Sequence, residues 1–256
     1  MELQRGVWIS DEPDVFLAHG IPHECVPGRQ AASVLRIEGA FYTADDMESL
    51  PVRTVAIVLF EGFTVLDAYG PIQAFAAAGV RKEDGSYHRY FRILTVGKLE
   101  GPVRSGEGPA TVADFSFDNL PQCDILLIPG GIGTRALVED RDFLHLVERA
   151  SHGAELTATV CTGAALLART GLLDERPATS NKIAWDWVLQ QGEKVLWKRK
   201  ARWVDDGDIA TSSGVSAGTD VALALIARLH DRETAERAAR VMEYVWNADP
   251  ANDPFA

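Results

Sequence analysis

The sequence predicts an α/β fold in which a mostly parallel sheet is covered by helices on both faces. From residue 54 onward, short apolar runs rich in β-branched residues alternate with segments of helix-forming residues. Strands that alternate with helices in this order form a parallel sheet. A strand-like run also begins at Leu156 and passes directly into an Ala- and Leu-rich run, with Cys161 at the junction.

The expected strands are continuous apolar runs bounded by turn residues, as in the buried strands of a parallel sheet. They cover residues 54–60, 90–96, 124–128 and the run that begins at 156. The Gly- and Pro-rich region 97–117 predicts a small hairpin excursion between the second and third of these strands. A hairpin turn signal, Asp205-Asp206-Gly207, joins two further short apolar runs.

The expected helices follow the strands and carry apolar residues at helical spacing. They run through 74–78, cover 141–150, follow Cys161, and then cover 182–190, 216–229 and 233–246. In the helix over 182–190, Trp185, Val188 and Leu189 lie on one apolar side. The alternation predicts one large α/β domain, and the chain has no internal repeat.

Cys161 lies where the last buried strand must turn sharply into a helix. The small residues Ala158 and Gly163 leave room for such a turn, which is the geometry of a nucleophile elbow. The N–H groups and dipole at the start of the helix should stabilise a thiolate, so the pKa of the Cys161 thiol is expected to fall below that of a free thiol. The alternative is that Cys161 is a small buried apolar residue, a common position for free cysteine.

Functional groups collect at the carboxyl ends of parallel strands, where three loops of this chain should meet. The loop after the first strand leads to Asp67, which is either a functional acid or a first-turn residue that complements the helix dipole. The loop after the third strand carries Gly130 and Gly131, whose N–H groups either bind an anion or form a plain tight turn. No Lys-Ser/Thr pair follows these glycines, so the loop is not a phosphate loop. The third loop is the turn at Cys161.

The composition excludes several classes of partner. The chain has 256 residues and a formal net charge of −12, and the basic cluster Lys198 to Lys200 is too short to bind a phosphate backbone. We therefore expect no nucleic-acid partner and no membrane partner. The three cysteines are widely spaced without a CxxC pair, which argues against disulfides and structural zinc. No signal-peptide pattern or long apolar run occurs, so a soluble, cytoplasmic protein is expected.

Residues 1–52 differ in character from the rest of the chain. Prolines and glycines interrupt them, and their short apolar islands predict an arm that packs on the main domain or on a partner subunit. His19, His23 and Cys25 lie in this arm, but no regular element would hold them at the spacing of metal ligands. The expected organisation is thus an arm over 1–52 and an α/β domain over 53–256.

Six motifs in the α/β domain resemble the ThiJ/PfpI superfamily, and within it the isonitrile hydratase-like branch. They are Phe60-Glu-Gly62, Leu66-Asp67, Gly70-Pro71, Pro129-Gly130-Gly131, Val160-Cys161-Thr162-Gly163 and Ser213-Gly214-Val-Ser-Ala217-Gly218-Thr-Asp220. The resemblance extends from about residue 54 to residue 246. It implies a flavodoxin-like three-layer sandwich with a cysteine nucleophile elbow, in a protein that forms a homodimer.

The same resemblance implies roles for individual residues. Cys161 takes the position of the nucleophile and Asp67 that of the acid beside it. Thr162 matches the threonine that follows the cysteine in the hydratases, and its backbone N–H would form an oxyanion-type site with Gly131. Protease-like members have His at this position, so peptide cleavage by a Cys-His pair is not expected. The hydratase-like pattern usually has His where Asn181 stands, which affects substrate contacts on that side because an amide cannot transfer protons near neutral pH.

The reaction that this resemblance implies is the addition of water to a small isonitrile, which yields an N-substituted formamide. A Cys161 thiolate would attack the terminal carbon while Asp67 donates a proton, and no metal or organic cofactor is needed. One alternative is glyoxalase-type action on small reactive aldehydes such as methylglyoxal. Another is a non-catalytic domain that senses oxidation through the cysteine, or that binds a ligand like the domains attached to AraC-type regulators.

Overall fold

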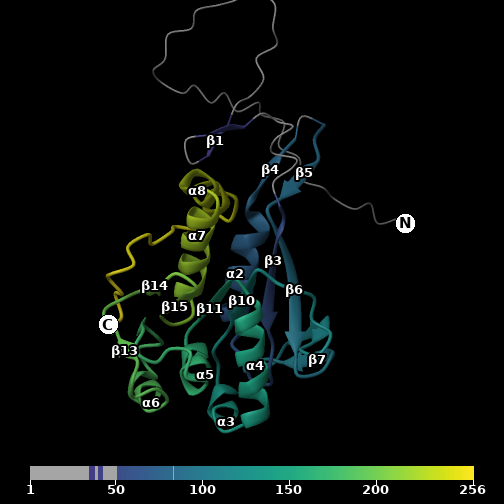
Figure 1. The fold of residues 1–256 in the computed structure, drawn as a ribbon. Helices are drawn as coiled ribbons and strands as arrows, with labels where there is room; N and C mark the ends of the chain where they lie inside the picture. Colours follow the sequence, from purple (N-terminus) through teal and green to yellow (C-terminus); the bar gives the residue numbers. More distant parts are fainter. Residues whose placement is uncertain (1–34, 38–39, 43–50, 83) are drawn as a thin grey trace, which may run out of the picture. The chain divides into compact units, whose positions relative to one another are not determined.

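A computed structural model of the chain describes residues 35–37, 40–42, 51–82 and 84–256 (Figure 1). Most of the expected arm over 1–52, including His19, His23 and Cys25, lies outside the described residues. Two short strands within it are described, β1 (Leu35–Ile37) and β2 (Ala40–Tyr42), which pair in antiparallel fashion. The boundary at residue 52 stays a prediction.

The centre of the domain is a seven-stranded sheet with the order β14-β15-β11-β10-β3-β6-β9. Six neighbouring strands pair in parallel and only the edge strand β14 is antiparallel to its neighbour β15. The mostly parallel sheet is therefore confirmed. In the order of the chain, its strands are β3 (Arg53–Val58), β6 (Phe91–Gly97), β9 (Phe115–Ser116), β10 (Ile125–Ile128), β11 (Leu156–Thr159), β14 (Trp203–Asp205) and β15 (Ile209–Ser212).

The order of the parallel strands fixes where a site can form. Across the sheet, five of the parallel strands lie in the order β6-β3-β10-β11-β15. Numbered by their place in the chain, this order is 2-1-3-4-5, which is the flavodoxin-like arrangement. The strand order reverses between β3 and β10, and the loops after these two strands diverge at the carboxyl edge of the sheet. Ligands of such sheets bind at this edge.

Helices cover both faces of the sheet and complete three layers. Figure 1 shows α2, α7 and α8 together on one face, with α3, α4 and α5 on the other. The predicted helix after β11 is present as α5. The helices are α2 (Val65–Ala77), α3 (Thr134–Leu137), α4 (Arg141–Gly153), α5 (Gly163–Arg169), α6 (Trp185–Leu189), α7 (Ala217–Leu229) and α8 (Arg232–Val241).

Three pairs of short strands form separate two-stranded sheets in the α/β domain. The predicted excursion over 97–117 is present as a hairpin, and its end contributes the edge strand β9. The pairs are β4 (Gly79–Arg81) with β5 (Tyr87–Arg89), β7 (Gly101–Arg104) with β8 (Ala110–Ala113), and β12 (Pro177–Ala178) with β13 (Leu196–Trp197).

Two helices are shorter than the sequence predicts. The helix expected over 233–246 ends at Val241, because the Tyr244 hydroxyl and the Trp246 indole N–H turn back to bond with Asp220 of α7. The helix expected over 182–190 begins only at Trp185, after a turn in which the Asn181 side chain accepts the backbone N–H of Ala184. At the end of α8 a tertiary contact replaces helical hydrogen bonds, and before α6 a local bond from the backbone to a side chain does so.

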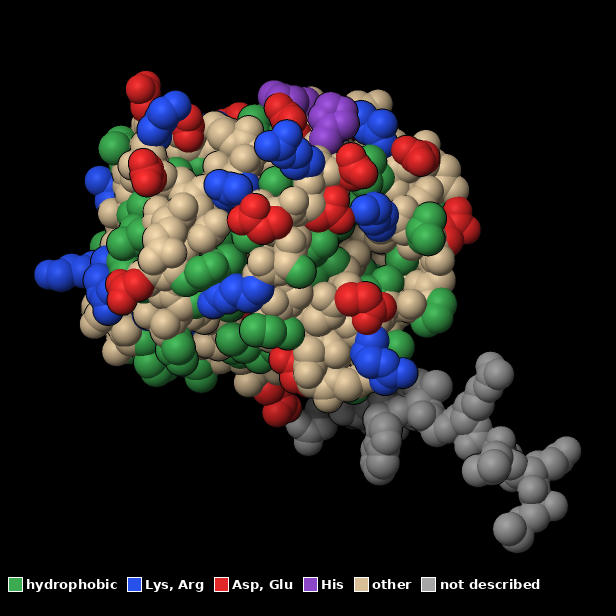
Figure 2. Space-filling model, turned by 90° about the horizontal axis from the view of Figure 1, so that it is seen from below, with side chains coloured by type: hydrophobic (Ala, Val, Ile, Leu, Met, Phe, Trp, Pro, Cys, Tyr) green, Lys and Arg blue, Asp and Glu red, His purple; other side chains and the backbone are tan. Residues whose placement is uncertain are grey.

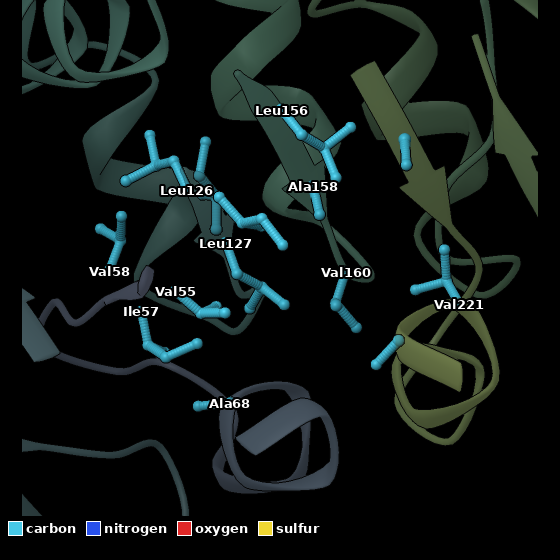
Figure 3. Packing of buried hydrophobic residues seen from close by; sticks show 14 of the residues in the cluster. Val55, Ile57, Val58, Ala68, Leu126, Leu127, Leu156, Ala158, Val160 and Val221 are labelled. Carbon is cyan, nitrogen blue, oxygen red and sulfur yellow. The ribbon is translucent and has the colours of Figure 1, made fainter. Parts of the chain in front are cut away.

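Part of the hydrophobic core lies between the sheet and the layer of α2 and α7. Figure 3 shows Ile57 of β3, Leu127 of β10 and Val160 after β11 packed near Ala68 of α2 and Val221 of α7. All five are fully buried or nearly so. Each Å² of apolar surface that is buried stabilises the fold by about 25 cal/mol. The packed side chains thereby hold the strands in register and fix the loops at their carboxyl ends.

The surface carries both signs of charge. Seen from below the view of Figure 1, basic and acidic side chains alternate over the face, with apolar groups between them and no patch of one sign (Figure 2). Among the residues that the structure describes, no helix is long and apolar enough to cross a membrane.

Candidate functional site

Cys161 lies in the sharp turn between β11 and α5 that the sequence predicts. Its φ angle is 57°, in the left-handed region that a residue with a Cβ atom rarely occupies. Strained backbone of this kind is typical of nucleophile elbows, where it presents the side chain at the edge of the sheet. The turn is tightly built, because a Cβ atom on Gly163 would collide with the carbonyl oxygens of Ile128 and Pro129.

The carboxyl group of Asp67, in the first turn of α2, lies beside the Cys161 thiol. Its side chain is fully buried; Oδ2 accepts the backbone N–H of Gly130 at 2.9 Å, and Oδ1 has no hydrogen-bond partner. Burial raises the pKa of Asp67 to about 7, although the Gly130 N–H and the Cys161 thiol each lower it. Burial therefore has a larger effect on the pKa of this carboxyl group than its hydrogen bonds have.

The prediction of a low pKa for the Cys161 thiol is wrong. The side chain is only 6% exposed, and this burial, followed by the negative charge of Asp67, raises the thiol pKa to about 12. The N–H groups of Thr162, Val215 and Asn181 lower it, but three donors do not offset the loss of water around the sulfur. The resting group is therefore a thiol beside a carboxyl group that titrates near neutral pH.

Asn181 lies beside the sulfur. Its Nδ2 donates to Cys161 Sγ at 3.2 Å, and its Oδ1 accepts the N–H of Ala184 at 2.8 Å. The preceding residue, Ser180, donates its hydroxyl to the carbonyl oxygen of Cys161 at 2.6 Å. The segment around Asn181 thus holds both the backbone and the side chain of the cysteine.

Gly130 and Gly131 hold side chains of the site. The Gly131 N–H donates to Thr162 Oγ1 at 3.0 Å, and the Gly130 N–H is the donor to Asp67. The hydroxyl of Thr134 lies 3.2 Å from the same Thr162 oxygen. In this structure the Gly131 N–H is therefore engaged by Thr162, which differs from the open oxyanion-type pair expected from the sequence.

Several neighbours of the sulfur escaped the sequence analysis. The carbonyl oxygen of Ser213 accepts the N–H of Cys161 at 3.0 Å, and the Val215 N–H reaches the sulfur. Both follow β15, a fourth strand whose carboxyl end meets the same edge. Thr134 and Arg135 come from α3, directly after the Gly130–Gly131 loop. Only the Ser213 motif carried a signal in the sequence.

A buried group of charges supports the segment that carries Asn181. Lys182 Nζ donates to Thr179 Oγ1 at 2.7 Å and to the Ser180 carbonyl oxygen at 3.1 Å, and burial lowers its pKa to about 8. The buried carboxylate of Asp253 lies 3.7 Å from Lys182 Nζ and 3.7 Å from Arg202 Nη1. Such charges remain buried only because each has an opposite charge nearby.

The part of the chain that the structure describes contains no group of three or more His, Cys, Asp or Glu side chains placed to hold a metal ion. The site consists of one thiol, one buried carboxyl group, an amide donor and backbone N–H groups. Chemically, this set can form and release a covalent adduct on sulfur while the carboxyl group carries a proton.

Comparisons with known proteins agree with this geometry. The DJ-1/PfpI family profile matches residues 53–228. An isonitrile hydratase from Pseudomonas putida is 30% identical over 190 residues, which cover 74% of this chain and 78% of the hydratase. A solved structure of a ThiJ/PfpI family protein from Pseudomonas syringae is 31% identical, with a TM-score of 0.67 over 80% of this chain and 81% of that one.

A regulatory protein is also similar. The HTH-type transcriptional regulator GbdR of Pseudomonas aeruginosa is 26% identical over 195 residues, which cover 75% of this chain. The match spans about half of the regulator, 51% of its length. The same domain therefore occurs both in a protein named as an enzyme and in one named as a regulator.

Proposed function

Because the chain belongs to the DJ-1/PfpI family, we propose that it is a cysteine-dependent enzyme that hydrates isonitriles to N-substituted formamides. One observation carries the proposal: the Cys161 thiol and the buried Asp67 carboxyl group interact at the elbow in a chain 30% identical to an isonitrile hydratase. A carboxyl group with a pKa of about 7 exchanges protons readily at neutral pH.

The first step joins the substrate to the sulfur. The Asp67 carboxylate accepts the thiol proton while Cys161 Sγ bonds to the terminal carbon of the isonitrile, and the proton is then delivered to that carbon. The S–H bond breaks, S–C and C–H bonds form, and the product is a thioimidate. Asp67 acts first as a base and then as an acid, because the thiol is protonated in the resting site.

The second step releases the product. Water adds to the thioimidate carbon, its proton passes through Asp67 to the nitrogen, and the C–S bond breaks as the C=O bond forms. The sulfur recovers its proton, so isonitrile plus water gives the formamide with no change in oxidation state. Asn181 and the Thr162 backbone N–H stabilise negative charge on the departing sulfur.

Thr162 takes a positioning role in this scheme. Its hydroxyl is already bonded to Gly131 and lies 3.2 Å from the Thr134 hydroxyl, so it fastens the glycine loop to the elbow.

Wild-type protein should convert an aliphatic isonitrile to the corresponding formamide, with methylglyoxal assayed in parallel. Mass spectrometry in ¹⁸O-labelled water should find one labelled oxygen in the formamide, because water supplies the carbonyl oxygen. Consumption of methylglyoxal with the isonitrile untouched would instead support the glyoxalase alternative. Turnover of neither compound would contradict both enzymatic proposals and favour a ligand-binding domain.

We also propose that the protein is a homodimer in the cytoplasm that acts on a small molecule. Large apolar side chains next to site residues are exposed: Leu66 by 46%, Ile132 by 69% and Ile183 completely. Exposed apolar groups that gather around one edge are typical of a surface covered by a partner subunit. Analytical ultracentrifugation should find twice the chain mass, and a monomer at micromolar concentration would contradict the proposal.

A further inference from the structure

Arg135 is a half-buried arginine that has no anionic partner among the described residues. It is the second residue of α3, directly after the Gly130–Gly131 loop. Its Nη1 atom is buried and has no hydrogen-bond partner, and its side chain forms no ion pair with the described residues. An unpaired buried donor of a charged group destabilises the folded protein, so such a group calls for a ligand or another reason to be kept.

Two other arginines differ from Arg135 in having a carboxylate nearby. Arg202 Nη1 is also buried without a hydrogen bond, but it lies 3.7 Å from Asp253 Oδ1. Arg202 donates to the Asp220 carboxylate at 2.6 Å and 2.8 Å, and Arg169 of α5 lies 3.6 Å from Glu139. Their charges are satisfied inside the protein. In a chain with a net charge of −12, acidic partners are plentiful, and Arg135 nevertheless has none among the described side chains.

The guanidinium of Arg135 is held in place by Trp187 of α6. Its central carbon lies 3.3 Å from the centroid of the indole ring, which is a stacked cation–π contact. Stacking uses the face of the guanidinium and leaves its N–H groups without a partner on the ring, among them the buried Nη1. A guanidinium fixed in this way presents parallel donors that match the two oxygens of a carboxylate.

Arg135 lies close to the reacting sulfur. Its neighbour Thr134 is 3.2 Å from the hydroxyl of Thr162, the residue after the cysteine. The negative charge of an ionised Cys161 acts on the Arg135 guanidinium, which places the two side chains within electrostatic range. A group attached to the sulfur therefore lies within the electrostatic range of the guanidinium.

We propose that Arg135, stacked on Trp187, recognises a carboxylate of the substrate while the reactive carbon of the substrate faces Cys161. The substrate class is then a small isonitrile that carries a carboxylate. The isonitrile part of this statement rests on the proposed function, whereas the carboxylate part rests on Arg135 alone. Arg135 is in this sense a residue that determines specificity.

The carboxylate part can be tested without any turnover by alkylating Cys161 with matched reagents. Iodoacetate and iodoacetamide differ in charge but not in the bond they form, as do 3-bromopropionate and 3-bromopropionamide. The measured quantity is the ratio of the two rates at Cys161, followed by mass spectrometry of its peptide. Because both reagents meet the same thiol, a change of thiol pKa in a variant cancels in this ratio.

Arg135→Met should lower the acid-to-amide ratio of at least one reagent pair by about 10- to 100-fold relative to wild type. Arg169→Met is the matched control, since it removes one positive charge whose partner is internal, and it should leave the ratio unchanged. If Arg135→Met fails to fold, as judged by its melting curve, Arg135→Gln serves as the same test. Equal ratios in wild type and the Arg135 variant for both pairs overturn the proposal.

The substrate class is tested with an isonitrile that carries a carboxylate and with its methyl ester. In wild type, kcat/KM should be about 10- to 100-fold higher for the acid, chiefly through KM, and Arg135→Met should abolish this preference. An equal kcat/KM for the two substrates overturns the substrate class. If neither isonitrile reacts, the proposed function fails, and the alkylation ratio still decides whether Arg135 binds a carboxylate.

Discussion

Replacing Cys161 with serine should lower kcat for isonitrile hydration at least about a thousandfold. A serine hydroxyl has a much higher pKa than a thiol and is a weaker nucleophile, and Asp67 with a pKa of about 7 cannot activate it. The substitution is nearly isosteric, so the protein should fold and its melting temperature should change little. The measurement is initial formamide production by purified protein under saturating isonitrile.

Cys123 provides a matched control in the same chain. It is also buried, 5% exposed, and burial raises the pKa of its thiol to about 11. It precedes β10 and lies outside the group of residues around Cys161. Cys123→Ser should therefore retain wild-type kcat, and a Cys161→Ser variant that also retained it would exclude covalent catalysis by this sulfur.

Asp67→Asn should lower kcat by a factor of about 10²–10⁴ and at the same time stabilise the protein at pH 8. The amide can still accept the Gly130 N–H, but it cannot carry the proton between sulfur and carbon. The gain in stability arises because the wild-type carboxylate is buried in its charged form at this pH.

The sign of this effect follows from proton linkage. The pKa of Asp67 is about 7 in the folded protein against 3.8 for the free group, so between these values the folded state binds more protons than the unfolded state. The contribution of Asp67 to the free energy of unfolding is therefore complete below about pH 4. It is lost as pH rises through 7, and the total loss is up to about 4 kcal/mol. The thiol of Cys161 adds a similar loss only above its free pKa of 9.0.

Urea unfolding at pH 4.5, 6 and 8 measures this difference. The free energy of unfolding of Asp67→Asn should exceed that of wild type at pH 8, and the gap should close toward pH 4.5. Asp186→Asn, at an exposed position of α6, should follow the wild-type curve at all three values. If the free energy of unfolding of Asp67→Asn changed with pH as it does in wild type, the Asp67 carboxylate would be solvated and would not be the proton carrier proposed above.

Much of the fold could be predicted because it depends on local patterns. Buried parallel strands are continuous apolar runs, and the turn at Cys161 needs small neighbours such as Gly163, so both are visible in the chain itself. Burial of Asp67 could also be predicted, because its flanking residues are apolar. The strand order then brings Asp67, Gly130 and Cys161 to one edge.

The remaining features depend on contacts between distant segments. The pKa of the Cys161 thiol is set by how much water reaches it and by the charge on Asp67, and neither quantity is encoded in the helix that follows. Arg135 belongs to no motif. Its proposed role rests on Trp187, some fifty residues later, and on the absence of an anionic partner among the described side chains. The early end of α8 depends on Asp220, which belongs to another helix.

Asp253 lies far along the chain from the segment that it helps to hold. Its carboxylate lies beside Lys182 and Arg202, and Lys182 donates to the segment after β12 from which Asn181 approaches the sulfur. A nascent chain emerges from the ribosome with its N-terminal part first. Cys161 therefore leaves the ribosome long before the residue that completes its surroundings. We therefore expect the Asn181 segment to be fully held beside the sulfur only after Asp253 has been synthesised and has docked.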